Sequence, residues 1–242
     1  MAACGGTYAN RRRTTCGARQ PTFYQWCGLD CKIRRALRDL PERFGPWKSV
    51  FNRFSNRCRK GSWDAIFKSL AFNEDEIAAL MDGTVIRAHQ DSSGGRGGQK
   101  KNCIGRSRGG CSTKIHALTD SVGMPLHLEI TQGQDHDITK AEALLAAASA
   151  AAIVADTAYD SNAFRAAVEA KSKELVVMNH PNRKNPRRLN HALYAIRFNV
   201  ERFFHSLKRF RRVASRYEKT ARNFKGMVHV ACALLWVGIG CI

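Results

Sequence analysis

Residues 190–213, NHALYAIRFNVERFFHSLKRFRRV, are the stretch that decides the fold. In an α-helix each residue advances about 100° around the axis, so residues three or four apart share a face. On that geometry one stripe of the segment is apolar, and its members are Leu193, Ile196, Val200, Phe203, Phe204, Leu207 and Phe210. We therefore expect one long helix that packs this stripe onto a core.

The same segment carries a second, polar stripe. Its members follow one another at helical offsets and are Tyr194, Arg197, Glu201, His205 and Lys208. Glu201 is the only acid between Glu174 and Glu218. A lone carboxylate among cations is compatible with a metal or phosphate site, and equally with a surface helix whose glutamate neutralises its neighbours. The segment alone leaves both interpretations open.

The composition is that of a basic globular chain. Its 242 residues are 44% hydrophobic, enough for one substantial core and a small appended module. Forty Lys and Arg against twenty Asp and Glu give a net charge of +20, which favours nucleic acid as partner over a membrane surface. Nine cysteines, an odd number, without a signal peptide favour reduced thiols, so we expect a cytoplasmic protein.

Upstream of the long segment, strand and helix patterns alternate. Five stretches have the apolar or alternating pattern of strands: 77–90, 112–120, 123–134, 151–156 and 173–181. Helices are expected at 138–150 and 162–170, and another in the apolar run 226–242, which is too short to span a membrane. Three strands, a helix, a strand, a helix, a strand and a long helix predict an α/β fold.

Several acidic residues lie within a predicted strand, at the end of one, or just before a predicted helix. Asp82 falls inside the first strand, where a buried carboxylate is costly unless it is paired or binds a metal ion. Asp156 falls at the end of the fourth strand. The cluster 135–137 (Asp-His-Asp) and Asp160 each precede a helix, so capping is their simplest role, with a metal cluster at 135–137 as the alternative.

The N-terminal third is less regular. Residues 47–70 contain two helical patterns joined across Lys60 and Gly61, the raw form of a helix-turn-helix, although two packed helices without a DNA role fit as well. Residues 91–110 are rich in glycine and cations but lack the phosphate-loop signature, so we expect a basic loop near DNA. Residues 1–31 have no periodicity.

Four motifs together resemble a known family. Tyr194, Arg197, Glu201 and Lys208 reproduce Y-x2-R-x3-E-x6-K, the signature of the insertion-sequence-four and insertion-sequence-five groups of bacterial DDE transposases. The stretches 81–89, 105–126 and 154–161 look like the corresponding segments of the insertion-sequence-five group. The resemblance covers about 39–238, and its three acids are Asp82, Asp156 and Glu201, with residue-number differences of 74 and 45.

The resemblance implies an RNase H-like core, a mixed five-stranded sheet flanked by helices, with a small helical N-terminal region. Implied domains are 1–31, unassigned and either disordered or foreign to the family; 32–76, a truncated helix-turn-helix-like region; and 77–242, the catalytic domain. Relatives generally begin with further helices, whose apolar periodicity is missing here. We therefore expect this chain to bind DNA with little preference for its own terminal repeats.

The resemblance also implies the chemistry. Asp82 and Asp156 would hold two divalent ions, Mg²⁺ or Mn²⁺, and Glu201 would complete the set, because carboxylates are hard oxygen ligands. Lys208 would join them as a catalytic residue that meets a phosphate. The residues implied to bind DNA are Tyr194, Arg197, Lys208, Arg209, Arg211 and Arg212. For Tyr194 a structural role, and for Arg197 pairing within the protein, remain alternatives.

The implied function is DNA transposition, a form of DNA recombination, by cleavage and strand transfer at the ends of an insertion sequence. The expected partner is double-stranded DNA, both terminal repeats and target, bound by a homo-oligomer. Between Lys208 and Lys225 the cations oppose only Glu218, which suits a duplex. A catalytically silent or truncated DNA-binding remnant is the alternative, and an RNase H-like nuclease acting on other nucleic acids is a third.

Overall fold

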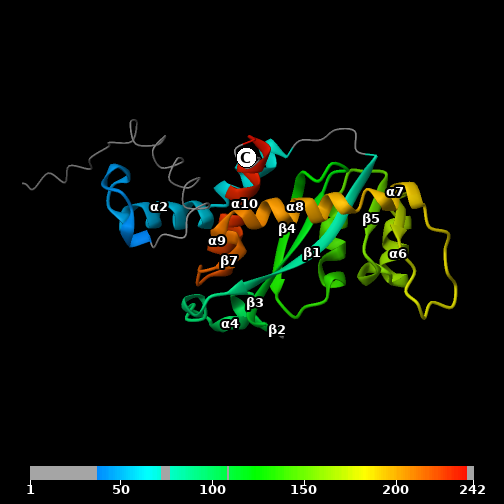
Figure 1. The fold of residues 1–242 in the computed structure, drawn as a ribbon, viewed down its shortest axis with the longest axis horizontal. Coiled ribbons are helices and arrows are strands. Elements are labelled where there is room, and N and C mark those ends of the chain that lie inside the picture. The colour runs from blue at the N-terminus through cyan, green and yellow to red at the C-terminus, as the bar shows by residue number, and fades with distance from the viewer. Residues whose placement is uncertain (1–36, 72–76, 108, 239–242) are drawn as a thin grey trace, which may run out of the picture.

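The computed structural model describes residues 37–71, 77–107 and 109–238, and the expectations for 1–36 lie outside these ranges. One mixed sheet runs through the molecule (Figure 1). Its central strand is β1 (Ala78–Ala88), which pairs antiparallel with β3 (Gly110–Thr119) and parallel with β5 (Ala152–Ala155). In spatial order the five main strands are β4 (Pro125–Gln132), β3 (Gly110–Thr119), β1 (Ala78–Ala88), β5 (Ala152–Ala155) and β6 (Glu174–Val177).

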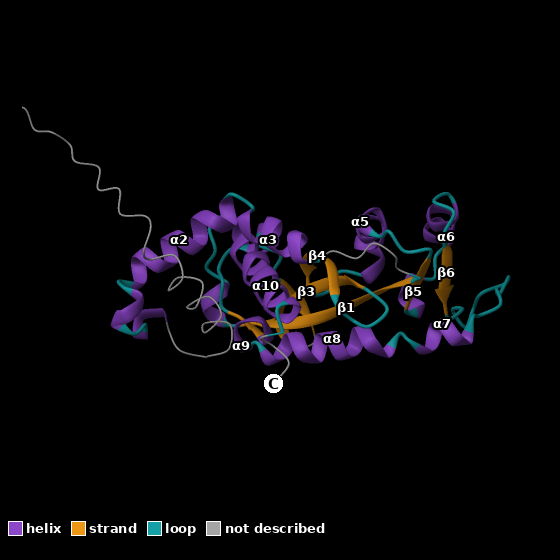
Figure 2. Ribbon diagram, turned by 90° about the horizontal axis from the view of Figure 1, so that it is seen from above, coloured by secondary structure: helices purple, strands orange, loops and turns teal. Residues whose placement is uncertain are grey.

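Helices cover both faces of this sheet because the strands are apolar on both sides. Ala78 and Leu80 belong to one hydrophobic cluster, and Ala79 and Met81 to the other, as the two-residue period of a strand requires. Figure 2 shows α8 on one side of the sheet and α5 and α6 on the other. The helices of the first cluster are α2 (Trp47–Arg59), α3 (Ser62–Leu70), α8 (Phe198–Arg209), α9 (Arg211–Ala214) and α10 (Ala221–Trp236). Those of the second are α5 (Ala141–Ala147) and α6 (Asn162–Glu169).

The predicted α/β fold class is confirmed, but within the described ranges the sheet has seven strands where the sequence predicted five. The two additional strands are β2 (Gly105–Ser107), which pairs with β3, and β7 (Ser215–Arg216), which pairs with β1. Both are too short for a periodicity to be read from the sequence. The basic loop predicted at 91–110 also contains α4 (Gly98–Lys101), and the buried Asn102 side chain donates to the carbonyls of Arg96 and Gly98.

The single helix predicted over 190–213 is wrong, because the segment forms three helices. They are α7 (His191–Ala195), α8 and α9 (Arg211–Ala214). Between α7 and α8 the amides of Arg197 and Val200 bond to carbonyls three residues earlier, at 3.1 Å each, so the chain tightens there into a 3₁₀-like turn. Phe210 ends α8 in an extended conformation. The apolar stripe nevertheless packs on the core, as predicted.

The two N-terminal helices meet at the predicted turn and share a core with the sheet domain. Gly61 has φ 69°, a left-handed conformation that favours glycine. Phe54, Trp63 and Phe67 are buried in the same cluster as the apolar side of α10. The Phe67 ring stacks on His229 of α10 with centroids 5.4 Å apart. Residues 47–70 and the sheet therefore do not have separate cores.

Helix α10 is the core-covering helix expected at the C-terminus, and polar contacts fix it to β4. The Trp236 indole N–H donates to the carbonyl oxygen of Pro125 at 2.8 Å. Lys225 Nζ lies 3.0 Å from Glu129 Oε1, and His127 Nε2 lies 3.2 Å from the same oxygen. Within the described ranges the helices are too short or too polar to cross a membrane.

We expect Glu129→Gln to lower the free energy of unfolding at pH 7 by about 1–2 kcal/mol, the order of a partly buried charged hydrogen bond. Burial alone would raise the pKa of Glu129, but His127 and Lys225 lower it from 4.5 to about 2. Because the folded pKa is below the unfolded one, the stabilisation is present above about pH 4.5 and is lost as the pH falls towards 2.

Urea denaturation across this pH range measures the effect. The control is Glu142→Gln, which changes an exposed acid on α5. A Glu129→Gln difference that stayed constant from pH 7 to pH 2 would contradict the prediction.

Candidate active site

Strand pairing places the first two predicted acids side by side. Met81 of β1 is the register partner of Ala155 in the parallel strand β5. Asp82 follows Met81, and Asp156 follows Ala155, the last residue of β5. The two carboxylates therefore stand next to each other where the strand pairing ends. Asp82 and Asp156 each come two residues after a buried residue of the hydrophobic cluster that contains α8. Because side chains two residues apart on a strand share a face, both aspartates lie on the face that α8 crosses.

The two aspartates use their oxygens in the same way. Oδ1 of Asp82 accepts a hydrogen bond from the Gly83 amide at 2.7 Å, and Oδ1 of Asp156 accepts one from the Thr157 amide at 2.8 Å. Each Oδ2 lies 3.6 Å from the same atom, Nη2 of Arg197. One oxygen of each side chain is thus fixed by the backbone, and the other faces the turn between α7 and α8.

Helix α8 adds the third predicted acid. Arg197 stands at the N-terminus of α8, and its Nη1 donates to Oε1 of Glu201, one turn later, at 2.7 Å. A single guanidinium therefore contacts acids from β1, from the end of β5 and from α8. The exposed fraction rises from Asp82 (17%) through Asp156 (44%) to Glu201 (52%), so the site is open towards Glu201.

Burial and neighbouring charges make this site electrostatically unusual. Burial raises the pKa of Asp82 from 3.8 to about 6, and the charges of Asp156 and Asp137 add to the rise, while the Gly83 amide and Arg197 oppose it. Burial lowers the pKa of Arg197, but Asp156, Asp82 and Glu201 raise it beyond its usual value. The site thus carries more negative charge than one guanidinium compensates.

The donor set fits a divalent cation. Asp82, Asp156 and Glu201 offer hard carboxylate oxygens, the ligands that Mg²⁺ and Mn²⁺ take. Within the residues that the structure describes, no three His, Cys, Asp or Glu side chains form a metal cluster as they stand, and Arg197 lies between the acids. Metal ions and the guanidinium therefore offer alternative ways to balance the same charges.

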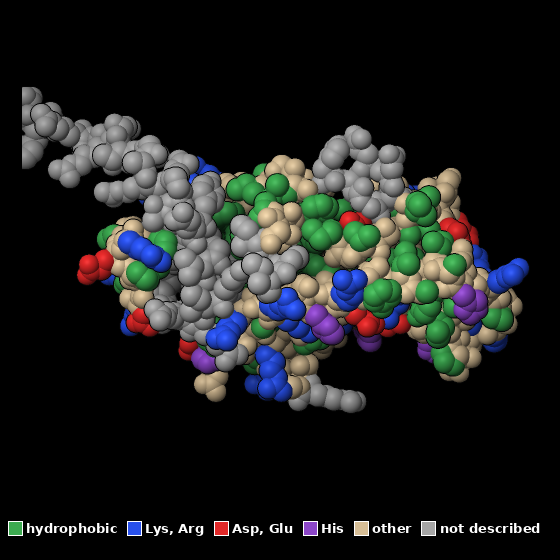
Figure 3. All heavy atoms as spheres, turned by 45° about the horizontal axis from the view of Figure 1, so that its top comes forward, with side chains coloured by type: hydrophobic (Ala, Val, Ile, Leu, Met, Phe, Trp, Pro, Cys, Tyr) green, Lys and Arg blue, Asp and Glu red, His purple; other side chains and the backbone are tan. Residues whose placement is uncertain are grey.

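The other predicted residues fall into two groups. Lys208, Arg209 and Arg211 are exposed near the C-terminal end of α8 and on α9. Arg212 pairs with the buried Glu218 at 2.7 Å, and Tyr194 packs against the core cluster next to α8. On the face drawn in Figure 3, single Lys and Arg side chains are scattered from one end of the molecule to the other among hydrophobic and acidic side chains.

The sequence predicted that the cations between Lys208 and Lys225 all face DNA, but Arg216 does not. It is fully buried, and its guanidinium donates to the Glu218 carbonyl at 3.0 Å and to Thr113 Oγ1 at 2.6 Å. Lys225 is likewise engaged with Glu129. Arg216 and Lys225 therefore stabilise the fold and add little positive charge to the surface.

The capping role predicted for the 135–137 cluster is wrong. No side chain caps η4 (Asp137–Lys140). Asp137 instead lies on the α5 side of the sheet, where a side chain at Gly83 would collide with it, and its carboxylate is 3.3 Å from Lys114 Nζ and 3.5 Å from His116 Nδ1. A buried charge network thus stands behind Asp82, and no spacing in the sequence indicates it.

Asp160 does not cap α6 either, since Ser161 performs that role. Its side chain is fully buried and pairs with Arg165 at 2.7 Å and with Arg183 at 3.1 Å. Arg183 follows β6 and is distant in sequence, so this ion-pair centre could be found only from the tertiary structure.

We expect Asp82→Asn to raise the free energy of unfolding of the metal-free protein by about 1–3 kcal/mol at pH 8. The folded pKa of Asp82, about 6, exceeds its model-peptide value of 3.8, so ionisation disfavours folding. That cost is absent below about pH 3.8 and complete above about pH 6. Denaturation in EDTA at pH 8 and pH 4 tests this, and a variant less stable than the wild type at pH 8 would show that pairing with Arg197 outweighs burial.

Comparison with known proteins identifies relatives. The sequence profile of the transposase DDE domain family matches residues 73–236. A Brucella ovis protein assigned as the transposase for insertion sequence element IS6501 is 38% identical over 128 residues, which are 52% of this chain and 98% of the relative. The uncharacterized protein y4sN of Sinorhizobium fredii is 37% identical over 59 residues, 24% of this chain and 47% of that protein.

One solved structure has a comparable fold. The piggyBac transposase, in a synaptic complex with hairpin DNA, aligns with a TM-score of 0.53 at 13% identity, over 96% of this chain and 69% of that chain. At this identity the likeness concerns the fold alone. The mixed sheet flanked by helices is thus of the RNase H-like type, as predicted.

Proposed function

Since this chain belongs to the transposase DDE domain family, we propose that it binds the ends of an insertion sequence, cleaves a phosphodiester bond there and joins the freed strand to target DNA. The observation that carries the proposal is the meeting of Asp82, Asp156 and Glu201 at one guanidinium. The spacing of Tyr194, Arg197, Glu201 and Lys208 supports the insertion-sequence-four or insertion-sequence-five type.

Two metal ions are the proposed cofactor. Asp82 and Asp156 would hold them through the oxygens that now face Arg197, and Glu201 would complete the ligand set. Bound Mg²⁺ or Mn²⁺ would supply Lewis acidity at the phosphate and at the leaving oxygen. The backbone amides of Gly83 and Thr157 keep the other oxygens of the two aspartates fixed, so the ligands are oriented before DNA arrives.

The reaction needs no covalent enzyme intermediate. In cleavage the oxygen of a water molecule bonds to phosphorus as the bond from phosphorus to the 3′-oxygen breaks. The water gives up a proton, and the departing 3′-oxygen takes one up to become the 3′-hydroxyl. In strand transfer the freed 3′-hydroxyl takes the place of water. Arg197 lies among the acids and can stabilise a phosphate once metal ions pair with the carboxylates, because a guanidinium donates two parallel hydrogen bonds to phosphate.

Exposed cations would hold the DNA backbone beside the acids. Lys208 lies two turns beyond Glu201 on α8, and Arg209 and Arg211 follow it, all three exposed. Such cations neutralise phosphates on any sequence. We propose double-stranded DNA as the partner, both terminal and target, bound by a homo-oligomer.

A catalytically silent DNA-binding remnant is the second candidate. The departure of residues 1–31 from the family pattern favours it. The presence of all three acids in one place argues for the active enzyme. Incubation with Mg²⁺ and duplexes that carry the DNA flanking the coding region separates the two, because only the enzyme cuts them.

We expect Asp82→Ala, Asp156→Ala and Glu201→Gln each to reduce strand cleavage at least about a hundredfold while DNA binding stays within about threefold, since each change removes a proposed metal ligand rather than a phosphate contact. Gel assays of cleavage and binding with one labelled terminal duplex give both values. Cleavage at the wild-type rate in any one variant would remove that residue from the catalytic set.

Lys208→Ala should slow cleavage as well as weaken binding, whereas Arg211→Ala should weaken binding alone. Both side chains are exposed cations, but Lys208 is on the helix that carries Glu201. Single-turnover cleavage at saturating protein separates the two effects, because it is insensitive to a modest loss of affinity. Equal single-turnover rates for both variants would count against an active-site role for Lys208.

A further inference from the structure

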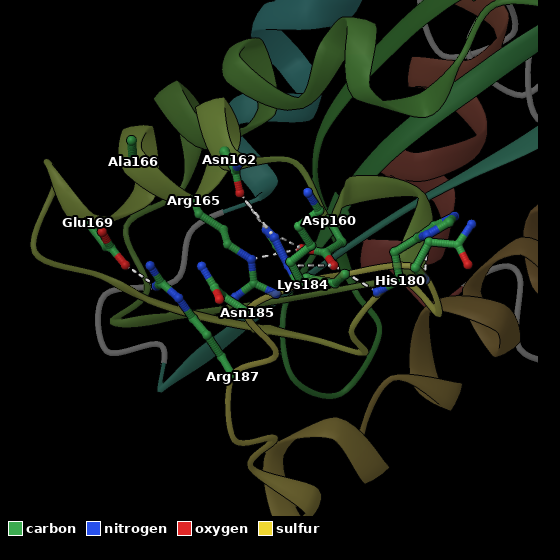
Figure 4. Close-up of a pocket in the computed structure, with 11 residues that line it drawn as sticks. Asp160, Asn162, Arg165, Ala166, Glu169, His180, Lys184, Asn185 and Arg187 are labelled. Atoms are coloured by element: carbon green, nitrogen blue, oxygen red, sulfur yellow. Dashed lines mark hydrogen bonds and ion pairs between the residues drawn. The ribbon is translucent and has the colours of Figure 1, made fainter.

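A cationic pocket begins one short turn of the chain after Asp156 and takes no part in the proposed chemistry. It has a volume of about 640 Å³ and is formed by α6 and the segment 178–190 that follows β6 (Figure 4). Four cationic side chains line it against two carboxylates, an excess of two positive charges. The charged lining residues are Arg165, Arg183, Lys184, Arg187, Asp160 and Glu169.

Both acids of this pocket are already engaged. The Asp160 side chain is fully buried. Burial raises its pKa, but hydrogen bonds from Arg165 and the His180 amide bring the pKa below its usual value, so the carboxylate is ionised at neutral pH. Glu169 pairs with Arg187 near the surface, where both side chains are about half exposed and the pair is weak. An anion in the pocket would therefore meet Arg165 and Arg183, which share one buried carboxylate, and Arg187, whose pair with Glu169 is weak.

The segment 178–190 is fixed before any ligand binds. Oδ2 of Asp160 accepts hydrogen bonds from the His180 amide at 2.8 Å and from Arg183 Nε at 3.2 Å. The Asn179 side chain bonds to both the amide and the carbonyl of Arg187, at 3.0 and 2.7 Å. A site that is already ordered loses less conformational entropy on binding.

Lys184 is the cation that remains available. It is exposed, and no hydrogen bond or ion pair joins it to another side chain among the described residues. Figure 4 shows it at the pocket together with Asn185 and Arg187. A flexible ammonium of this kind suits a phosphate oxygen as a point charge.

The position of the pocket points to DNA. Asp156 and Asp160 flank the short turn η5 (Thr157–Tyr159), so Asp160 of the pocket lining follows Asp156 by one turn of the chain. Both ribbon views place the segment 178–190 at one end of α8 and α9 at the other (Figures 1 and 2). A DNA strand that crosses the acids has phosphates on both sides of the reacting one, and Lys208 and Arg211 serve only one side.

We propose that this pocket binds a backbone phosphate of the DNA on the side of the acids opposite to α9. The proposal rests on the proposed function, because that function makes DNA the ligand. It assigns to Lys184 and Arg187 a contact that the family signature does not contain. The phosphate is recognised by charge, so the site is expected to work on any sequence.

The test measures the affinity of the full chain for a labelled random-sequence duplex, in EDTA, between about 50 and 200 mM salt. Lys184→Ala should reduce the slope of log affinity against log salt by about 1, because one phosphate contact is lost. Ala166→Trp should have the same effect without removing a charge, because Ala166 is exposed and lines the pocket.

Two control variants make the result specific. Ala163→Trp adds the same ring to α6 away from the pocket lining, and Arg188→Ala removes an exposed cation of the same segment that does not line it. Both should keep the wild-type slope. The proposal is overturned if Lys184→Ala and Ala166→Trp bind like the wild type, or if either control lowers the slope as much as they do.

The outcome is separable from that of the proposed function. The binding assay needs neither metal nor cleavage, so a catalytically silent chain still reports on the pocket. A wild-type chain that cleaves terminal duplexes while all four variants share its slope overturns only the pocket. A wild-type chain that binds no duplex overturns both proposals.

Discussion

The contact between Arg197 and three acids is the constraint on which the arrangement of this molecule depends. It joins the middle of β1, the end of β5 and the first turn of α8. Without a cation at this point the acids would repel one another, and burial already raises the pKa of Asp82 to about 6. The tight turn before α8 sets where that guanidinium stands, so a local break in the helix has a direct consequence for the site.

The two-residue period of β1 separates the face of the sheet at which the three acids meet from the face that α5 and α6 cover. Asp82 faces α8, whereas Gly83, the next residue, faces Asp137 on the side of α5. The lysine and histidine that accompany Asp137 therefore lie on the opposite side of the sheet from the three acids. The charge of Asp137 still acts across the sheet, since it adds to the rise in the pKa of Asp82.

The large positive charge is used in two different ways. Arg165 and Arg216 are buried and bind acceptors within the protein, where a guanidinium satisfies several oxygens at once. Lys184, Lys208 and Arg211 are exposed. A sum of charges over the sequence counts buried and exposed cations equally. The number of cations in 208–225 is therefore larger than the number that the surface presents to a partner.

The sequence by itself determined the order of the main elements and the apolar stripe of α8, because each rests on a local period. The three acids were picked out by the resemblance of four motifs to a known family. The sequence could not determine the short strands β2 and β7 or the division of 190–213 into three helices, since these depend on pairing and on turn geometry. The partners of Asp137 and Asp160 were equally hidden. Hydrogen bonds and ion pairs between Asp160 and Arg183 form only when β5 and β6 pair in parallel and bring their following loops together, and that is a property of the tertiary structure.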